Sequence, residues 1–329
     1  MDCPSCGGRC VRPAAHVLNS IDYVYMACRS CKNEPHIDKN APRRSLQTAG
    51  LERCEHCGKA PLDLVMLEAM DLLVEEGLRD DREPLRSVGS PMIEIGYPLP
   101  YPPRLGNSQL ILLMERVNRN AASRLIEIPE IKGVIRRSRH IPGVVDKNGH
   151  TWELLAGCDM RCDIIQSIYG DLVIYKNQSK IHIEFPRESY PKIRILEGLR
   201  IAGRSVIDGL CGPGTLGLVC VLAGAKKVVM NDIWLPAIEN VLINLDANRD
   251  LLGIDSIELF DRGEKLVGSS PRLVGRAKGA CEIDVFHGDI RELFSAVSPS
   301  DICILDHFPG APLDEIKRAG SSCDEIVVI

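Results

Sequence analysis

Residues 204–232 constrain the fold of this chain more than any other stretch of its 329 residues. Their sequence, RSVIDGLCGPGTLGLVCVLAGAKKVVMND, begins with a short apolar run at 205–207 that fits a buried strand. A glycine-rich turn follows, 216–223 is apolar enough for a buried helix, and 228–230 fits a second strand. The order strand, turn, helix, strand predicts a βαβ unit and therefore a doubly wound α/β domain with a parallel sheet.

Two kinds of cofactor could bind at such a turn. Gly212, Gly214 and Gly217 fit the spacing G-x-G-x-x-G, in which glycines let the backbone approach a ligand, and this pattern alone would suggest a dinucleotide. Asp208 stands four positions before the first glycine and favours a different ligand. A carboxylate there would repel a pyrophosphate and attract the ammonium and sulfonium groups of S-adenosylmethionine. We therefore expect S-adenosylmethionine as the cofactor, and not a nicotinamide dinucleotide.

The acid and the two first glycines also carry a resemblance to a known family. Asp208, Gly212 and Gly214 stand in the order D-x-x-x-G-x-G, which resembles motif I of the class I S-adenosylmethionine-dependent methyltransferases. The resemblance implies a Rossmann-like class I methyltransferase domain, and it implies that the protein is an enzyme that transfers a methyl group.

A longer region, 130–310, resembles the central part of the archaeal tRNA guanine-N1 methyltransferases and of their aminocarboxypropyl-transferring relatives in wybutosine synthesis. The order of the expected elements carries this resemblance: a hairpin at 172–185, a Pro-Arg step that contains Arg187, a helix, and then motif I with Asp232 after it. The resemblance implies tRNA modification as the function. The cysteine-rich N-terminus lies outside it.

Each polar group of the methyl donor calls for a particular side chain at the end of a strand. Asp208 and the carbonyls of the glycine turn suit the methionyl ammonium. Asp232, after the second strand, suits the two ribose hydroxyls, with Asn231 as an alternative, and Asp289, after the third strand, suits the adenine amino group. The predicted donor-binding residues are Asp208, Gly209, Gly212, Gly214, Asp232, Asp289 and, as apolar walls around the adenine, Ile233 and Ile290.

The fourth strand, expected at 301–305, leads into the turn DHFP at 306–309. Ligands of this fold bind at the carboxyl ends of the strands, so we expect this turn to face the transferred methyl group. Asp306 or His307 could remove the proton of the acceptor, and Arg187 could stabilise charge on it. The tRNA enzymes resemble one another in an Asn-Leu-Pro type turn at this place, and this chain departs from them because it has DHFP there. A thiol or carbon nucleophile on a protein would therefore suit the Asp or His base equally well.

Cysteine spacing predicts zinc. The chain has 14 cysteines, and in an intracellular protein the three C-x-x-C pairs of the first 57 residues indicate metal binding and not a disulfide framework. Cys3, Cys6, Cys28 and Cys31 stand in the spacing C-x2-C-x21-C-x2-C, which resembles a zinc ribbon and can supply four thiolates to one closed tetrahedral site. A second zinc site is expected at Cys54 and Cys57. Its further ligands would come from Cys10, His36, His56, Cys158 or Cys162.

Charge and hydropathy narrow the partners. The net charge of −5 and the aromatic content of 4% do not by themselves indicate a nucleic-acid-binding protein. However, 116–147 contain eight Lys or Arg against three acids, and this balance of +5 could contact phosphates or form a solvated face. The chain has no run of 18 apolar residues, and its N-terminus MDCPSCGGRC does not resemble a signal peptide. We expect a soluble, cytoplasmic protein without a membrane partner.

Composition also suggests how the chain is divided. Helices are expected at 63–77 and 108–126, and a proline-rich extended segment at 87–106 separates them. The predicted parts are a zinc-ribbon-like module (1–60), a helix with a proline-rich linker (61–106), a small α+β domain for substrate recognition (107–187) and a Rossmann-like domain that binds S-adenosylmethionine (188–329).

Two departures from the resembled family are expected in the last part. The segment 258–280, rich in Gly, Ser, Arg and Lys, should be a mobile insertion before the third strand. The chain stops at a fifth strand, 325–329, so that the sheet would be shortened by the family's final antiparallel pair. The N-terminal half or a partner chain would then complete its edge, which makes a homodimer a candidate assembly.

The leading hypothesis is a methyltransferase that uses S-adenosylmethionine and acts on a macromolecule, with a tRNA base favoured as the acceptor. The runner-up acceptor is a protein side chain, for example a Cys or a carbon atom of a partner enzyme. A second alternative is a binding protein that uses the cofactor fold without catalysis, and a nicotinamide-dependent oxidoreductase is disfavoured by Asp208.

Overall fold

The computed structural model describes residues 2–143, 151–182, 190–260, 270–307 and 312–329. The C-terminal part is built on seven strands: β10 (Ser205–Asp208), β11 (Lys227–Asp232), β12 (Ile254–Leu259), β13 (Arg272–Gly279), β14 (Glu282–His287), β15 (Ile302–Leu305) and β16 (Glu325–Val328). They form one sheet in the order β12-β13-β14-β11-β10-β15-β16, in which the five strands from β14 to β16 run parallel. The βαβ unit predicted at 204–232 is confirmed.

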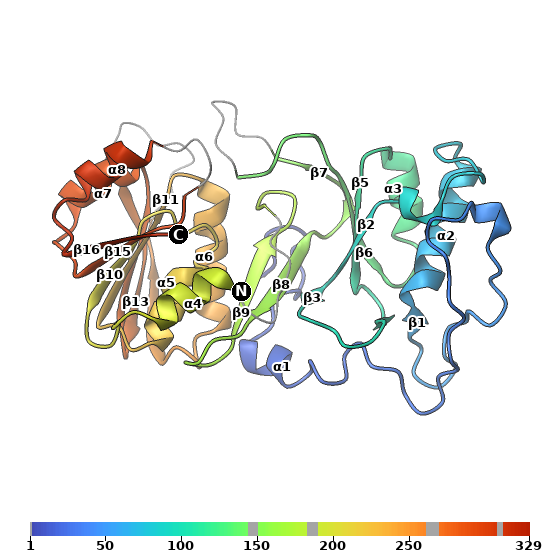
Figure 1. Ribbon diagram of the computed structural model, residues 1–329, viewed down its shortest axis with the longest axis horizontal. Coiled ribbons are helices and arrows are strands. Elements are labelled where there is room, and N and C mark those ends of the chain that lie inside the picture. Colours follow the sequence, from blue (N-terminus) through green and yellow to red (C-terminus); the bar gives the residue numbers. More distant parts are fainter. Residues whose placement is uncertain (1, 144–150, 183–189, 261–269, 308–311) are drawn as a thin grey trace.

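Helices cover both faces of this sheet (Figure 1). On one face lie α4 (Pro191–Glu197), α5 (Thr215–Leu222) and α6 (Leu235–Ala247), and on the other lie α7 (Ile290–Ala296) and α8 (Leu313–Ala319). Successive side chains of a strand point to opposite faces. Val206 of β10 therefore packs in the core with α5 and α6, whereas Ile207 packs in the core with α7 and α8. The fold is a doubly wound, Rossmann-like α/β domain, as predicted.

The segment expected to be a mobile insertion, 258–280, contains the end of β12 and the whole of β13. Strands β12 and β13 pair antiparallel with each other, and β13 pairs antiparallel with β14. Of the described residues of this predicted mobile insertion, Arg272–Gly279 form a regular strand of the sheet, β13. Val274 and Ala277 are fully buried, so this strand contributes to the core. The hairpin brings the sheet to seven strands by extending the edge beyond β14.

The N-terminal half carries smaller sheets (Figure 1). A four-stranded sheet has the order β2-β5-β6-β7 and a three-stranded sheet the order β3-β8-β9, while β1 pairs with β4. The strands are β1 (Ala60–Pro61), β2 (Ser90–Ile93), β3 (Ile95–Gly96), β4 (Arg104–Leu105), β5 (Leu110–Met114), β6 (Ile131–Arg136), β7 (Glu153–Gly157), β8 (Met160–Ile165) and β9 (Leu172–Asn177). The helices are α1 (Ala14–Leu18), α2 (Leu62–Glu75) and α3 (Arg119–Leu125), with short 3-10 turns at Arg43–Ser45 and Leu85–Ser87.

Three local predictions need correction here. The helix expected at 108–126 is a buried strand, β5, followed by the shorter helix α3, which Asn118 caps by accepting from the amide of Ala121 at 2.9 Å. The hairpin expected at 172–185 is not formed by its described residues, because β9 pairs with the preceding strand β8. The proline-rich segment 87–106 contains β2, β3 and β4. The four domain boundaries themselves stay a prediction.

Helix α6 presents a row of asparagines to the outer edge of β9. Asn240, Asn244 and Asn248 are spaced four apart, so they lie on one helix face, and all three are fully buried. The backbone N–H groups of Val173, Tyr175 and Asn177 donate to the side-chain oxygens of Asn248, Asn244 and Asn240 at 3.0, 2.6 and 2.9 Å, respectively. Four residues of helix rise about 6 Å and two residues of strand about 6.8 Å, so the two rows stay in register over this length.

These side chains replace the neighbouring strand that the edge of β9 lacks. The Nδ2 group of Asn244 donates to the carbonyl oxygen of Tyr175 at 3.0 Å, and that of Asn248 donates to the carbonyl of Val173 at 2.8 Å. A buried backbone group without a partner would be costly, so the asparagines stabilise the contact between α6 and the N-terminal half. The supports of the C-terminal sheet thus include a strand from the other half of the chain.

A buried ionic group joins β8 and β9. Asp163 is fully buried, and its carboxylate lies 2.5 Å from Nη2 of Arg161 and 3.2 Å from Nζ of Lys176. Arg161 also donates to Oε1 of Gln178 at 3.2 Å. Because ions are costly to bury without partners, the carboxylate of Asp163 is needed to compensate the buried charges of Arg161 and Lys176.

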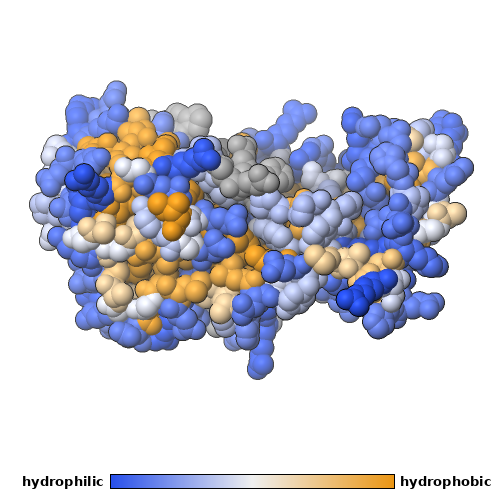
Figure 2. Space-filling model, turned by 60° about the horizontal axis from the view of Figure 1, so that its bottom comes forward, coloured by the Kyte–Doolittle hydropathy of each residue, from blue (hydrophilic) through white to orange (hydrophobic). Residues whose placement is uncertain are grey.

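The surface differs between the two ends of the molecule. Figure 2 shows a face on which apolar residues gather over the C-terminal part, at the left, while the N-terminal part is mostly hydrophilic. Exposed large apolar side chains of the chain include Ile168 and Ile195. Among the described residues, none of the helices has the length and apolar character needed to cross a membrane.

Candidate functional site

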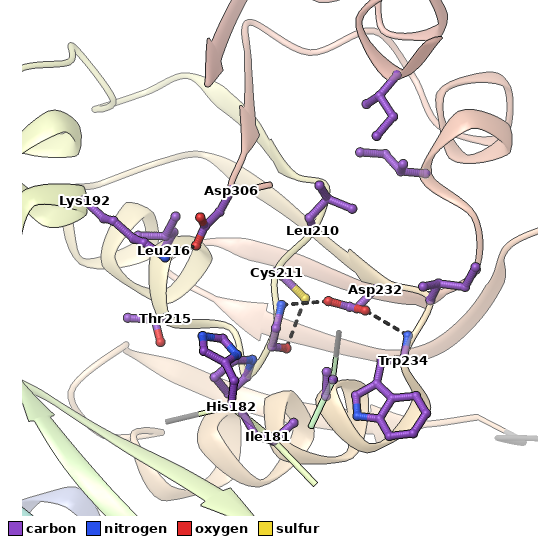
Figure 3. Close-up of a pocket in the computed structure, with 18 of the residues that line it drawn as sticks. Ile181, His182, Lys192, Leu210, Cys211, Thr215, Leu216, Asp232, Trp234 and Asp306 are labelled. Carbon is purple, nitrogen blue, oxygen red and sulfur yellow. Dashed lines mark hydrogen bonds and ion pairs between the residues drawn. The ribbon is translucent and has the colours of Figure 1, made fainter. Parts of the chain in front are cut away.

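A pocket of about 380 Å³ lies at the carboxyl ends of the parallel strands. The turns that follow β10, β11, β14 and β15 line it, and so do residues of α4 and of 181–182. Figure 3 shows Asp232 and Trp234 together at one side of this pocket and Lys192 and Asp306 together at another. This is the edge of a doubly wound sheet at which ligands bind, so the pocket is the candidate site.

The glycine turn forms the floor of the pocket. Gly212 and Gly214 have φ angles of +52° and +90°, which glycine adopts without steric cost. Gly217, in the first turn of α5, allows a close approach: a Cβ there would lie 2.7 Å from Cγ and Sδ of Met230. A Cβ at Gly209 would lie 2.1 Å from Cδ1 of Ile290, so this glycine serves packing. Of the predicted glycines, only Gly212 lines the pocket itself.

Asp208 lies beneath the turn. Its side chain is fully buried, and Oδ2 accepts from the amide N–H of Gly217 at 2.7 Å. Burial raises the pKa of Asp208 to about 7, against the hydrogen bond from Gly217, and the nearby carboxylates of Asp306 and Asp232 raise it further. The residue does not line the pocket. The structure therefore places Asp208 as a support of the turn and a source of charge below it.

Asp232 lines the pocket at the end of β11. Its Oδ2 accepts from the amide of Gly212 at 2.9 Å and its Oδ1 from the amide of Trp234 at 2.8 Å (Figure 3). Burial raises its pKa, although these backbone donors act in the opposite direction. Each carboxylate oxygen can accept a second hydrogen bond, so Asp232 can bind a pair of hydroxyl groups. The alternative residue, Asn231, is fully buried and donates to the carbonyls of Gly209 and Gly288 at 3.2 and 3.1 Å.

Asp289 and two isoleucines form a further wall. Asp289 caps α7 by accepting from the amide of Arg291 at 2.9 Å, and its ion pair with the Arg291 guanidinium lowers its pKa. Ile290 is buried, whereas Ile233 is 42% exposed and can therefore cover a bound ring. All four residues line the pocket. A flat apolar group with a polar edge fits between the isoleucines and Asp289.

The predicted catalytic residues are only partly brought together. Asp306 lines the pocket, and its Oδ2 lies 2.7 Å from Nζ of Lys192 (Figure 3). His307 follows it in the chain but does not line the pocket, and its buried Nδ1 has no partner among the described residues. Arg187 lies outside the described residues. Asp306 is therefore the better placed of the two candidate bases.

Several pocket residues were missed by sequence reasoning. They are His182, Tyr190, Lys192, Cys211, Thr215 and Trp234. Trp234 is the N-cap residue of α6, two residues after Asp232, and its Nε1 donates to the carbonyl of Lys180 at 3.0 Å. Its place next to the strand-end acid could have indicated it. His182 and Lys192 come from outside the βαβ pattern, and no spacing in the sequence connects them with it.

The site fits a cationic ligand with hydroxyl groups. In the described part of the chain, Oδ1 of Asp208 and Oγ1 of Thr215 are buried without a hydrogen-bond partner. Asp208, Asp232 and Asp306 also concentrate negative charge at the ends of three adjacent strands, β10, β11 and β15. Acceptors and negative charge suit an ammonium and a sulfonium, and they disfavour a pyrophosphate.

The cysteines of the N-terminal part form two groups of four. The first cysteine cluster consists of Cys3, Cys6, Cys10 and Cys158, and the second cysteine cluster consists of Cys28, Cys31, Cys54 and Cys57. The predicted pairing of Cys3 and Cys6 with Cys28 and Cys31 is therefore wrong, because the spacing C-x2-C-x21-C-x2-C joins ligands of different clusters. All six cysteines predicted to bind metal belong to one of the two clusters. Residues 2–59 contain turns and short helices but no named strand of a ribbon.

One cysteine pair outside these clusters is oxidised. A disulfide joins Cys303 of β15 to Cys323, and the remaining 12 cysteines are free.

The basic segment 116–147 is neutralised by acids from neighbouring elements. Six of its eight cations form ion pairs: Arg116 with Glu83, Arg119 and Arg136 with Glu153, Arg124 with Glu75 and Glu76, Lys132 with Glu94, and Arg137 with Glu115. Of the other two, Lys147 lies outside the described residues. The six partner acids outweigh the excess of +5 counted along the segment. Among the described residues of this segment, most of the positive charge is therefore paired with carboxylates.

The chain is similar in structure to several archaeal proteins. It matches Trm5b from Pyrococcus abyssi at 17% identity and a TM-score of 0.40, over 68% of this chain and 55% of that one. It matches the M. jannaschii tRNA m1G37 methyltransferase at 17% identity and a TM-score of 0.40, over 79% and 61%. It matches P. horikoshii TYW2 in complex with MeSAdo at 15% identity and a TM-score of 0.43, over 78% and 76%. The chain thus spans little more than half the length of the first two structures. No protein family model matches the sequence, and no curated protein does.

Proposed function

We propose that this chain is an S-adenosylmethionine-dependent methyltransferase that acts on a macromolecule. One observation carries the proposal: acids stand at the ends of three adjacent parallel strands around a glycine turn. Asp232 of β11 and Asp289, two residues after β14, line the pocket, and Asp208 of β10 is buried beneath the turn. A phosphate-containing cofactor would meet the carboxylates of Asp232 and Asp289 in the pocket, with Asp208 beneath them, whereas a sulfonium with an ammonium and a ribose would meet partners.

Different described residues would contact different parts of the donor. Asp232 would accept from the ribose hydroxyls while its existing bonds to Gly212 and Trp234 hold its carboxylate in place. Ile233 and Ile290 would enclose the adenine, with Asp289 at its edge. The negative charge of Asp208 beneath the turn would favour the cationic end of the donor.

Asp306 would act on the acceptor. When bound, S-adenosylmethionine supplies a methyl group that the sulfonium already activates. The protein then needs to align the acceptor and to remove its proton. The carboxylate of Asp306 faces the pocket and can take that proton, while Lys192 at 2.7 Å fixes its orientation. Tyr190 and His182 line the same pocket and could contact the acceptor.

The neutralised segment 116–147 favours a protein side chain as the second candidate acceptor beside a tRNA base. RNA binding depends on cations that replace counterions along the phosphates. Here six of eight such cations already pair with carboxylates. A thiol or carbon acceptor on a partner protein needs no such field, and Asp306 could serve it as a base.

Calorimetry and labelling test the proposal in two stages. Titration of S-adenosylmethionine into the full chain should show saturable binding that Asp232→Asn weakens about tenfold, equal to about 1.4 kcal/mol, and that NADH does not displace. An absence of binding at millimolar donor contradicts the proposal. A host extract incubated with the chain and a methyl-tritiated donor then identifies the acceptor: loss of label with ribonuclease assigns RNA, and loss with protease assigns protein. Binding without any labelling would instead favour a non-catalytic binding protein.

A further inference from the structure

The first cysteine cluster lies outside the donor pocket and has no part in the function proposed above. It joins Cys3, Cys6 and Cys10 of the N-terminal segment to Cys158, which follows β7. We propose that this cluster binds a zinc ion through four thiolates and that the ion fastens the N-terminal segment to the β8–β9 strand pair behind α6. The ligand set differs from the one that sequence spacing suggests, since Cys10 and Cys158 take the places of Cys28 and Cys31.

The distances between the sulfur atoms fit a tetrahedral metal site. Sγ of Cys158 lies 3.6 Å from that of Cys3 and 3.7 Å from that of Cys10, and Cys6 and Cys10 are 3.3 Å apart. All four sulfurs lie within 4.8 Å of one another. A tetrahedron with zinc–sulfur bonds of about 2.3 Å has edges of about 3.8 Å. A disulfide would need about 2.05 Å, so these contacts are not disulfide bonds.

The backbone around Cys3 forms a turn that directs its sulfurs inward. The amide of Cys3 donates to the carbonyl of Gly8 at 2.9 Å, and the amide of Gly7 donates to the carbonyl of Cys3 at 2.8 Å. Gly7 has a φ of +66°, which explains the glycine after the second cysteine. The same turn recurs in the second cysteine cluster, where Gly58 has a φ of +71° and donates to Cys54 at 2.7 Å. Two cysteine pairs far apart in the sequence are thus presented in one way.

The position of Cys158 depends on a close approach of β6 and β7. A Cβ on Gly133 would lie 2.2 Å from the carbonyl oxygen of Cys158, and one on Gly157 would lie 2.2 Å from that of Lys132. Gly157 also has a φ of +74°. The amide of Cys158 then donates to the carbonyl of Lys132 at 2.9 Å. Two glycines therefore bring the fourth thiol within reach of the N-terminal segment.

A buried cation, which also pairs with Glu94, lies beside such a site. Four thiolates around Zn²⁺ carry a net charge of −2, which is costly to bury without a counterion. The side chain of Lys132 is only 5% exposed, and its ammonium interacts electrostatically with Cys10 and Cys158. Its Nζ also lies 2.7 Å from Oε1 of Glu94, so the lysine is held in place beside the sulfurs.

Hydrogen bonds connect the cluster with helix α6. The carboxylate of Asp159, next to Cys158 in the chain, accepts from the hydroxyl of Ser5, from the amide of Ser179 at 3.0 Å and from Nδ2 of Asn177 at 3.4 Å. The amide of Asn177 donates to Oδ1 of Asn240 on α6 at 2.9 Å. A metal that joins Cys3 and Cys158 would therefore hold both ends of the network that supports β9.

Metal analysis of the full chain tests this inference, with the second cysteine cluster as a matched control. The wild type should bind two zinc ions, one in each cluster, and Cys158→Ser and Cys57→Ser should each bind one. Hydrogen exchange should separate these two variants. We expect at least about tenfold faster exchange of the amides of 2–12 and of β9 in Cys158→Ser only, because the two segments lose their shared ion. X-ray absorption spectra of the zinc in the wild type should be fitted by four sulfur neighbours around each zinc ion at about 2.3 Å.

Defined results would overturn the inference. Two zinc ions retained in Cys158→Ser, or a wild-type spectrum that needs nitrogen or oxygen neighbours, would refute the proposed ligand set. Equal exchange in Cys158→Ser and Cys57→Ser would refute the fastening role. Should Cys158→Ser fail to fold, Cys6→His, at an exposed position, replaces one thiolate by an imidazole and should keep two ions with one nitrogen neighbour in the spectrum. None of these readouts depends on donor binding, so they stand apart from the tests of the proposed function.

Discussion

The side chain of Asn244 holds both backbone polar groups of Tyr175: Oδ1 accepts from its N–H at 2.6 Å, and Nδ2 donates to its carbonyl at 3.0 Å. The same Nδ2 also donates to the carbonyl of Pro213 in the glycine turn at 2.9 Å. One amide on α6 therefore connects an edge strand of the N-terminal half with the floor of the donor pocket.

Asn244→Ala should weaken both folding and donor binding. The change leaves three buried backbone groups without partners, each worth about 1–3 kcal/mol, so we expect a loss of stability of at least about 2 kcal/mol in urea unfolding. Asn248→Ala is the matched control, since Asn248 bonds to Val173 and to Asn244 but not to the turn. Calorimetry should show weaker donor affinity only in Asn244→Ala. Equal affinity in the two variants would contradict a role of Asn244 in holding the turn.

Asp208 should make the stability of the protein without ligand depend on pH. Its pKa is about 7 in the folded chain, because burial raises it, and about 3.9 in an unfolded chain. The folded state therefore binds a proton more tightly. The stability contributed by this group is fully present below about pH 3.9 and is lost as the pH rises towards 7.

Urea unfolding of the wild type and of Asp208→Asn between pH 4 and pH 8 checks this prediction. Relative to the variant, the wild type should lose on the order of 1 kcal/mol per pH unit up to about pH 7 and then level off. Asparagine keeps an oxygen that can accept from the amide of Gly217, so the turn should survive in the variant. A wild type that instead gained stability relative to Asp208→Asn as the pH rises from 4 to 7 would contradict the assigned direction of the pKa shift.

Asp306→Asn should separate binding from chemistry. If Asp306 takes the acceptor's proton, kcat of the variant should fall about 10²–10⁴-fold, and the Kd for the donor should stay unchanged. His307→Gln is the control at the neighbouring position, because His307 does not line the pocket, and it should keep most of the activity. Single-turnover transfer from a tritiated donor measures both. A fully active Asp306→Asn would exclude the carboxylate as the base.

Asp163→Ala should destabilise the N-terminal half strongly. The change leaves the cations of Arg161 and Lys176 buried without their carboxylate, for which we expect a loss of about 3–5 kcal/mol. Glu115→Ala removes the partner of Arg137 in an exposed ion pair and should cost less than about 1 kcal/mol. Thermal and urea unfolding of the two variants give this comparison directly. Similar losses in both would mean that the buried group is not special.

The sequence predicts the centre of the C-terminal sheet well and its outer parts poorly. Strands such as β10 and β11 are short apolar runs between turn residues, and their pattern has one plausible structure. The run Leu110–Met114 is as apolar, but the sequence predicts part of a helix there, because five apolar residues in succession carry neither helical nor strand periodicity. The sequence does not indicate strand β13, because it contains glycine and charged residues, which are uncommon in strands.

The candidate site divides in the same way. Asp232 and Gly212 are neighbours across one βαβ unit, so local spacing predicts that they lie together. Lys192 meets Asp306 across 114 residues, and Cys158 meets Cys3 across 155. Contacts of this kind depend on the packing of whole elements, and no spacing rule in a single sequence contains them. The same reason explains why the four cysteines that stand in the zinc-ribbon spacing belong to two different clusters. They are Cys3, Cys6, Cys28 and Cys31.

The two cysteine clusters differ in when they can be completed during synthesis of the chain. The second has its four ligands between Cys28 and Cys57, so a short nascent chain already contains a full coordination set. The first lacks one ligand until Cys158 has been made and β6 and β7 have paired, which requires closing a loop of about 150 residues. A metal captured early by Cys3, Cys6 and Cys10 would keep an open position. The completion of that position would then show that the N-terminal segment has reached its place beside β7 and β8.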